Sequence, residues 1–273
     1  MTFLRRDELP SLLRAIHDPP RRLYMRGEGD PQLLSRPAVA VVGARACSPY
    51  GAQVARMLGR ELAGAGVVVV SGLARGVDGE AHRGALETEG QTVAVLGCGI
   101  DRDYPAAHAA LARTIGERSL LVSEYEPGVE PAPWRFPARN RIVAGLCAAT
   151  VVVEARERSG ALITADFALE DGREVFAVPG EITSALSAGT NALLRLGATP
   201  LTSAGDVLEA LGIESQPRPR PAAKDPLLQL LPATADELVR ATGLAPGEIA
   251  AALAELELSG LAAEGDGTYR ALA

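Results

Sequence analysis

Lysine is nearly absent from this chain: Lys224 is the one lysine among 27 basic residues, and the others are arginines. Cysteine is also scarce, and Cys47, Cys98 and Cys147 lie far apart. An odd number of dispersed cysteines argues against a disulfide framework or a zinc site and favours a reduced, cytoplasmic protein. No apolar run approaches the roughly 18 residues of a membrane span. The first ten residues lack the apolar segment of a secretory signal. We therefore expect no membrane association and no bound metal.

Acidic residues exceed basic ones, with a net charge of −7, but the excess is unevenly placed. From Asp225 onward there are eight acidic and two basic residues, so residues 1–224 carry only −1. Residues 131–160 contain five arginines against two glutamates. Because the local charge decides whether a polyanion can bind, the net acidity excludes neither nucleic acid nor nucleotides.

Short apolar runs alternate with helical patterns through the first three quarters of the 273 residues. The runs are 38–42, 67–70, 92–96, 120–123, 150–154, 174–178 and a weak one at 199–202. Such alternation predicts a doubly wound α/β domain with a parallel sheet covered on both faces, over residues 37–213. Residues 1–36 are expected to form an N-terminal extension with a helix near 9–17 and a strand at 23–26.

The last part of the chain has a different pattern. Proline-rich residues 214–224 predict a semi-rigid linker. After it, 226–231 predicts a short helix, Thr234 to Glu237 is a capping box, and Pro246 opens a helix that runs to about 259. The sequence 261–269 brackets Gly265 and Gly267, which is typical of a hairpin. Three short helices and a hairpin predict a winged-helix domain over residues 225–273.

Small and basic residues follow most of the expected strands, where parallel sheets bind ligands. Glycines admit an anion close to the backbone, and helix N-termini attract it. The same glycines would also suit the turns of any domain of this class. The candidates at these strand ends are Gly43, Arg45, Ser48, Ser71, Gly72, Arg75, Gly180, Gly189, Thr190 and Asn191.

A dinucleotide or P-loop site is not indicated. After the first strand, G-x-G-x-x-G would need glycines where Arg45 and Ser48 stand, and no G-x-x-x-x-G-K-[ST] is present. We expect no cofactor.

The segment 133–141, PWRFPARNR, interleaves Trp134 and Phe136 with three arginines. Single strands are held by cations on the backbone and by rings that stack on bases, at about 1–3 kcal/mol per base. The candidates are Phe136, Arg139, Asn140 and Arg141, ahead of an apolar helix expected at 142–149. Alternatively, both rings belong to the core and the arginines form a solvated face.

Ser159, Gly160 and Thr164 open the helix after the fifth strand. Ser159 can cap this helix and leave the following N–H groups free for an anion, although an ordinary N-cap would have the same sequence.

Six segments in this order resemble the bacterial DNA-processing protein A family (DprA/Smf): VGARACSPYG, SGLARGVDGEAH, FPARNRIVAGL, SGALITA, VPG and SAGTNALL. The resemblance covers about residues 9–211, and the C-terminal part is similar to the family's winged-helix domain. It implies an extended Rossmann-like fold that binds single-stranded DNA, forms a homodimer and loads RecA during natural transformation, without catalysis. By motif, Arg45 would bind phosphate, Phe136 would stack on a base, 139–141 would form a basic turn and Ser159-Gly160 an anion loop.

The chain departs from the family pattern at two points. Many members carry a longer N-terminal helical domain than these first 36 residues. Some members also have a lysine just ahead of the stacking aromatic, where Trp134 and Arg135 stand here.

Two other functions are compatible with the sequence. One is a nucleotide enzyme like the Rossmann-like phosphoribohydrolases, but the position that matches their catalytic glutamate holds Leu193. Asp78 and His82 could imitate an acid/base pair, although a helix-capping aspartate and a structural histidine fit the sequence better. The other is a nucleotide-sensing regulator whose C-terminal domain reads DNA.

The expected recognition helix of the winged-helix domain carries three glutamates and no basic residue. Phosphates would repel this charge, so the sequence predicts a protein-contact module there.

Overall fold

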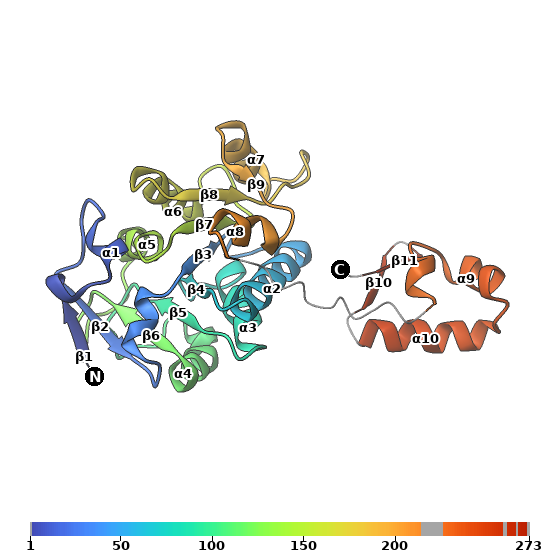
Figure 1. Cartoon of the computed structure of the whole chain (residues 1–273), viewed down its shortest axis with the longest axis horizontal. Coiled ribbons are helices and arrows are strands. Elements are labelled where there is room, and N and C mark those ends of the chain that lie inside the picture. Colours follow the sequence, from blue (N-terminus) through green and yellow to red (C-terminus); the bar gives the residue numbers. More distant parts are fainter. Residues whose placement is uncertain (1, 214–225, 259–260, 266, 272–273) are drawn as a thin grey trace. The chain divides into compact units, whose positions relative to one another are not determined.

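A computed structural model describes residues 2–213, 226–258, 261–265 and 267–271 (Figure 1). The chain divides into two compact units, residues 1–215 and 216–273. The division falls inside the linker expected at 214–224, which itself lies outside the described residues. No helix among the described residues is both long and apolar enough to cross a bilayer.

The first unit contains a nine-stranded sheet in the order β1-β2-β6-β5-β4-β3-β7-β8-β9. Seven strands, β6, β5, β4, β3, β7, β8 and β9, are parallel to one another, whereas β1 and β2 add an antiparallel edge. Their bounds are β1 Thr2–Arg5, β2 Arg22–Arg26, β3 Ala38–Val42, β4 Val68–Ser71, β5 Thr92–Val95, β6 Leu120–Ser123, β7 Ala149–Val152, β8 Glu174–Ala177 and β9 Thr199–Pro200. The seven expected parallel strands are thereby confirmed to within about two residues at either end.

Helices cover both faces of this sheet, which confirms the doubly wound arrangement. One face packs against α1 Ser11–Arg14, α5 Arg135–Gly145, α6 Gly160–Glu170 and α7 Ala188–Arg195. The other packs against α2 Pro49–Gly64, α3 Val77–Leu86, α4 Ala109–Arg118 and α8 Ala204–Ala210. Short 3-10 turns lie at Arg6–Glu8, Pro31–Ser35 and Ala106–His108.

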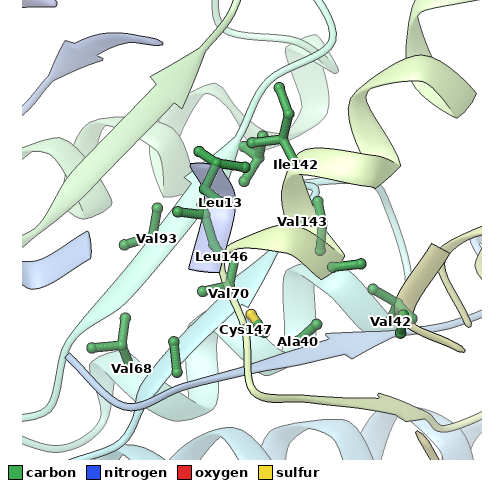
Figure 2. Close-up of a cluster of buried hydrophobic side chains, with 14 of the residues drawn as sticks. Leu13, Ala40, Val42, Val68, Val70, Val93, Ile142, Val143, Leu146 and Cys147 are labelled. Carbon is green, nitrogen blue, oxygen red and sulfur yellow. The ribbon is translucent and has the colours of Figure 1, made fainter. Parts of the chain in front are cut away.

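Alternation along each strand divides its side chains between two buried clusters. In β3, Ala38, Ala40 and Val42 face α5 and α6, while Val39 and Val41 face α2 and α3. Figure 2 shows the first of these clusters, in which Cys147 packs among valines and leucines. Cys47, Cys98 and Cys147 are all free thiols. Burial raises the pKa of the Cys147 thiol well above its ordinary value.

The strand order reverses between β3 and β7. From β3 the chain proceeds through β4, β5 and β6 in one direction, and from β7 through β8 and β9 in the other. At such a switch point the connections leave in opposite directions and open a crevice beyond the carboxyl ends of the strands. The site is therefore expected between the loops that follow β3 and β7.

Three local features of the first unit differ from the expectations. Strand β1 was not expected, and the helix near 9–17 is only Ser11–Arg14. Helix α5 begins at Arg135, seven residues before the expected start at 142. Pro137 is compatible with this start because the first-turn N–H groups of a helix have no intrahelical partner, so proline loses nothing there.

The second unit is a small winged-helix domain. A 3-10 turn at Leu228–Leu230 replaces the short helix expected there, and α9 Ala235–Thr242 and α10 Pro246–Leu258 precede the hairpin of β10 Ala262–Gly265 and β11 Thr268–Ala271. The expected capping box is present: Thr234 Oγ1 accepts from Glu237 N–H at 3.2 Å, and Glu237 Oε2 accepts from Thr234 N–H at 2.8 Å. Residue 259, the expected end of the last helix, lies outside the described residues.

Candidate nucleic-acid interface

The crevice at the switch point contains an open pocket that brings together more than half of the candidate residues. Loops after β3 and β4, the first turns of α5 and the start of α6 line it. The candidates among its lining residues are Gly43, Arg45, Gly72, Phe136, Arg139, Asn140, Ser159, Gly160 and Thr164. Gly43 and Thr164, 121 positions apart, thus meet because the parallel strands deliver their loops to one edge.

Arg45 supplies a cation at the mouth of this pocket. Its side chain is exposed and forms no ion pair with any residue that the structure describes. Its guanidinium carbon lies 5.4 Å from the centroid of the Phe136 ring, within cation–π range. An unpaired guanidinium beside a ring can hold a phosphate without first breaking a salt bridge.

A pair of aromatic rings forms the adjacent wall. Phe136 is half-buried, and Tyr104 stacks on it with ring centroids 5.3 Å apart and planes 21° apart. Tyr104 is 43% exposed, so its ring is available to a ligand. The sequence analysis did not find Tyr104, because it follows β5 by nine residues and lies 32 positions from Phe136.

Trp134 does not belong to the core, which contradicts the alternative assignment of both rings. It is 63% exposed, and the Arg135 guanidinium lies 4.7 Å from its ring and 5.2 Å from the ring of Tyr125. Arg135 therefore lies within cation–π range of two rings, of which Trp134 is exposed and Tyr125 half-buried.

The N-terminus of α6 opens into the same pocket. Ser159 Oγ accepts the Ala161 N–H at 3.3 Å, which confirms the expected N-cap, and the Asn140 amide donates to the Gly160 carbonyl at 3.0 Å. The first turn of α6 contains no acidic residue. Its positive dipole end is therefore open to an anion from outside.

The N-terminus of α2 is different, and this corrects the expectation for Ser48. The buried carboxylate of Glu154 accepts the Ser48 N–H at 2.9 Å and the Ser48 hydroxyl at 2.5 Å. A Cβ at Gly51 would lie 2.3 Å from Glu154 Oε2, so a glycine there leaves space for the carboxylate. An internal anion already occupies this helix end, and Ser48 lines a neighbouring pocket together with Gly180.

Arg139 is a buried structural cation rather than a free one. It is 4% exposed, and its Nη1 donates to the carbonyls of Gly72, at 2.6 Å, and of Val95. Burial lowers the pKa of Arg139, while the nearby Asp78 carboxylate acts in the opposite direction. This guanidinium forms part of the inner wall of the pocket. Gly72 packs directly against it, and there is no room for a Cβ at this position.

Asp78 and His82 are structural, in line with the reading that the sequence favoured. Asp78 Oδ2 accepts the N–H groups of Gly72 and Ala74 at 3.1 and 3.3 Å, and burial raises its pKa. His82 is fully buried beside Thr92 Oγ1 at 2.7 Å, and burial lowers its pKa to about 3. His82 does not line the pocket, so it cannot exchange a proton with a ligand there.

The 139–141 run is helical rather than a turn, so its side chains diverge by about 100° per residue. Arg141 faces away from the pocket and forms a bidentate ion pair with Glu124, at 2.9 and 2.8 Å, and a contact with Asp18 at 3.1 Å. This corrects the expectation that the three residues face one ligand.

The remaining candidates lie outside the pocket. Ser71 Oγ donates to the Val41 carbonyl at 2.6 Å, and Thr190 Oγ1 donates to the Ser187 carbonyl. The Asn191 side-chain amide accepts from the Gly180 N–H and donates to the Gly180 carbonyl. Gly189 packs against the Ala155 carbonyl, and Arg75 is exposed in the loop after β4.

The fold and this crevice define a doubly wound α/β protein that offers an unpaired cation, rings and a helix N-terminus to an anionic ligand. Comparison with known proteins is consistent with that class. A family model described as DNA recombination-mediator protein A matches residues 1–212, and a DprA winged helix domain model matches residues 212–268. The chain belongs to the DNA recombination-mediator protein A (DprA/Smf) family.

Among its relatives, a putative DNA processing protein DprA of Mycobacterium tuberculosis is 48% identical over 250 residues. The match covers 86% of this chain but only 64% of that relative's length. A DNA processing protein DprA of Streptococcus pneumoniae is 48% identical over 206 residues, which cover 74% of this chain and 71% of the relative.

Two solved structures are similar to the first unit. DNA processing protein A from Streptococcus pneumoniae has a TM-score of 0.72 and 45% identity, covering 76% of this chain and 73% of that one. DNA processing protein A from Helicobacter pylori, whose structure concerns its single-stranded DNA binding mode, has a TM-score of 0.70 and 32% identity, covering 77% and 96%.

Proposed function

We propose that this chain binds single-stranded DNA across the carboxyl edge of its sheet. The observation that carries this proposal is the juxtaposition of unpaired Arg45, the Tyr104–Phe136 ring pair and the open N-terminus of α6 around one pocket. A cation and a helix end suit a phosphate, and rings suit an unpaired base. The solved structure of the Helicobacter pylori relative concerns a single-stranded DNA binding mode, which supports the same ligand for this chain.

The experiment is fluorescence anisotropy with labelled single- and double-stranded oligonucleotides of the same sequence over a salt series. Tighter binding to the single strand, with a log–log salt slope of about −0.7 for each phosphate contact, is the expected result. Equal or tighter binding to the duplex would contradict the proposal and favour a regulator that reads double-stranded DNA.

We propose further that the bound strand is passed on rather than chemically altered. In this proposal the protein is a recombination mediator that protects incoming DNA and loads RecA in the cytoplasm during natural transformation. Family membership supports this role. Leu193, at the position where phosphoribohydrolases carry a glutamate, is buried and cannot act as an acid or base. Incubation with nucleoside monophosphates should release no free base, and strand exchange by RecA should accelerate when this protein is added.

A homodimer is the assembly that we propose. Leu196, at the end of α7, is 85% exposed, and Leu169, at the end of α6, is 54% exposed. Both helices lie on one face of the sheet and run in the same direction, so these leucines belong to the same edge. Light scattering after gel filtration should give twice the 28.3 kDa chain mass, and Leu196→Glu should reduce it toward the monomer.

A further inference from the structure

A second pocket lies on the other side of the β3–α2 loop. Its lining comes from the start of α2, the loop after β8, the residue that precedes α7, and the end of the β7 segment. The lining residues are Ser48, Pro49, Tyr50, Glu154, Pro179, Gly180, Glu181, Ser184 and Ser187. Loop residues 43–50 separate it from the first pocket, which Gly43 and Arg45 line.

The two pockets have opposite chemistry. The first contains two arginines and one buried aspartate that Arg139 offsets, whereas the second contains two glutamates and neither arginine nor lysine among its lining residues. A phosphate would be repelled from the second pocket. A neutral group that donates hydrogen bonds suits the Glu154 side chain, whose two oxygens already accept from the Ser48 N–H and hydroxyl.

Two further groups suit a flat, uncharged ligand. The Tyr50 ring is 52% exposed at the rim. Ser187 is 6% exposed, and its Oγ forms no hydrogen bond with any residue that the structure describes. This hydroxyl points at Gly180, where an added Cβ would lie 2.1 Å from it, so it faces the pocket rather than the protein interior. The hydroxyl is accessible from the pocket, where a ligand can form a hydrogen bond with it in place of solvent.

We propose that this second pocket holds a nucleobase of the bound strand and prefers a base with an exocyclic amine. The inference rests on the proposed single-strand binding. Cytosine presents an N4 amine to the Glu154 carboxylate and an N3 acceptor to the Ser187 hydroxyl. Thymine presents a carbonyl oxygen where cytosine has the amine, and two acceptors repel each other. Discrimination here comes as much from this repulsion as from the attraction.

The experiment compares labelled oligo-dC and oligo-dT of about 20 nucleotides by anisotropy at about pH 8. The two bases are both pyrimidines of similar size, and a homopolymer presents the same base in every register. We expect oligo-dC to bind the wild-type protein at least about threefold more tightly than oligo-dT. Glu154→Gln should bring the dC/dT ratio close to one, because an amide side chain can accept from the cytosine amine or donate to the thymine carbonyl. Ser187→Ala should weaken the binding of both oligonucleotides, because the hydroxyl can donate to cytosine N3 or accept from the thymine N3–H.

Glu170→Gln is the matched control, since it makes the same charge change at an exposed position on the last turn of α6, and it should keep the wild-type ratio. Ser187→Ala leaves the Glu154–Ser48 contacts intact, so it tests the pocket even if Glu154→Gln fails to fold. A wild-type ratio of one, a ratio that survives Glu154→Gln, or an unchanged affinity of Ser187→Ala for both oligonucleotides would overturn the base pocket while leaving single-strand binding intact. Failure to bind either oligonucleotide would instead overturn the proposed function on which the pocket rests.

Discussion

Arg45 and Arg139 show that the same residue type has two roles at this crevice. Arg45 is exposed and lacks an ion-pair partner in the described part of the chain, whereas Arg139 is 4% exposed and bonded to carbonyls at the ends of β4 and β5. The sequence places both near the ligand but cannot separate them, because burial depends on contacts made across the sheet.

Arg45→Ala should weaken binding to single strands of every sequence. Losing one phosphate contact should reduce the magnitude of the log–log salt slope by about 0.7, which anisotropy over a salt series measures. Arg113→Ala, at an exposed position on α4, is the matched control and should behave as wild type. An unchanged slope in Arg45→Ala would place the phosphate elsewhere.

Phe136→Ala should weaken binding through a different physical term. Loss of a stacked base contact costs about 1–3 kcal/mol, and because stacking releases few counterions the salt slope should stay the same. Tyr104→Ala should have a similar effect, since its ring stacks on Phe136 and is the more exposed of the two. Normal binding by both variants would show that these rings do not contact bases.

His82 makes stability depend on pH. Burial lowers its pKa in the folded state to about 3, while an unfolded chain protonates histidine near 6.5. The unfolded state therefore binds the additional proton as pH falls from 6.5 to 3, and the folded state loses on the order of 3 kcal/mol between pH 6.5 and 4.5.

His82→Asn should not lose stability in this way. The difference in free energy of unfolding between this variant and the wild type should therefore become smaller as the pH falls. Urea unfolding at pH 7 and 4.5 measures it, with the exposed His17→Asn as the matched variant. A deficit that stays constant with pH would contradict a buried neutral histidine.

At the scale of elements, helix α5 joins the site to the sheet. Its Phe136 faces the crevice, its Arg139 holds the carboxyl ends of two strands, and its Ile142 and Val143 enter the core (Figure 2). One helix thus carries the ligand side chain and the anchors that position it. The apolar part of this helix could be predicted from the sequence, but the polar first turns from Arg135 were not expected to be helical.

Arg139→Met should destabilise the fold before it affects any DNA contact. Removing the guanidinium leaves the carbonyls of Gly72 and Val95 without their donor and removes the charge that offsets the buried Asp78 carboxylate, and each buried polar group left unsatisfied costs about 1–3 kcal/mol. Chemical denaturation measures this loss. The double variant Asp78→Asn with Arg139→Met should recover part of it, because the uncompensated charge is removed. Arg45→Ala, in contrast, should unfold within about 0.5 kcal/mol of wild type.

At the scale of the whole molecule, the seven parallel strands and the winged helix could be predicted from periodicity, capping and turn residues. The position of the crevice could be predicted because parallel strands bring their glycine and arginine loops to the same edge of a sheet. Strand β1 and two contacts between distant segments could not be predicted. Glu154 occupies the α2 N-terminus from 106 residues away, and Arg141 pairs with Glu124 and Asp18. Both are contacts between distant segments that leave no local pattern.

The winged-helix domain carries an acidic surface where DNA-reading domains of this shape carry basic residues. Glu248, Glu255 and Glu257 of α10 are exposed, and in the described residues of this helix no side chain is basic. The net charge of −6 beyond residue 224 repels phosphates, so this unit should contribute little DNA affinity and instead contact another protein.

A protein that ends at residue 213 should therefore keep most of its single-strand affinity. It should bind slightly more tightly than the full chain at low salt, and the difference should vanish as salt screens the repulsion. Anisotropy on both proteins over the same salt series measures this difference. The matched control is the full chain with Glu248, Glu255 and Glu257 changed to glutamine, since this variant removes the charge while keeping the domain. An affinity loss of about tenfold or more in the shortened protein would show that the winged helix grips DNA despite its charge.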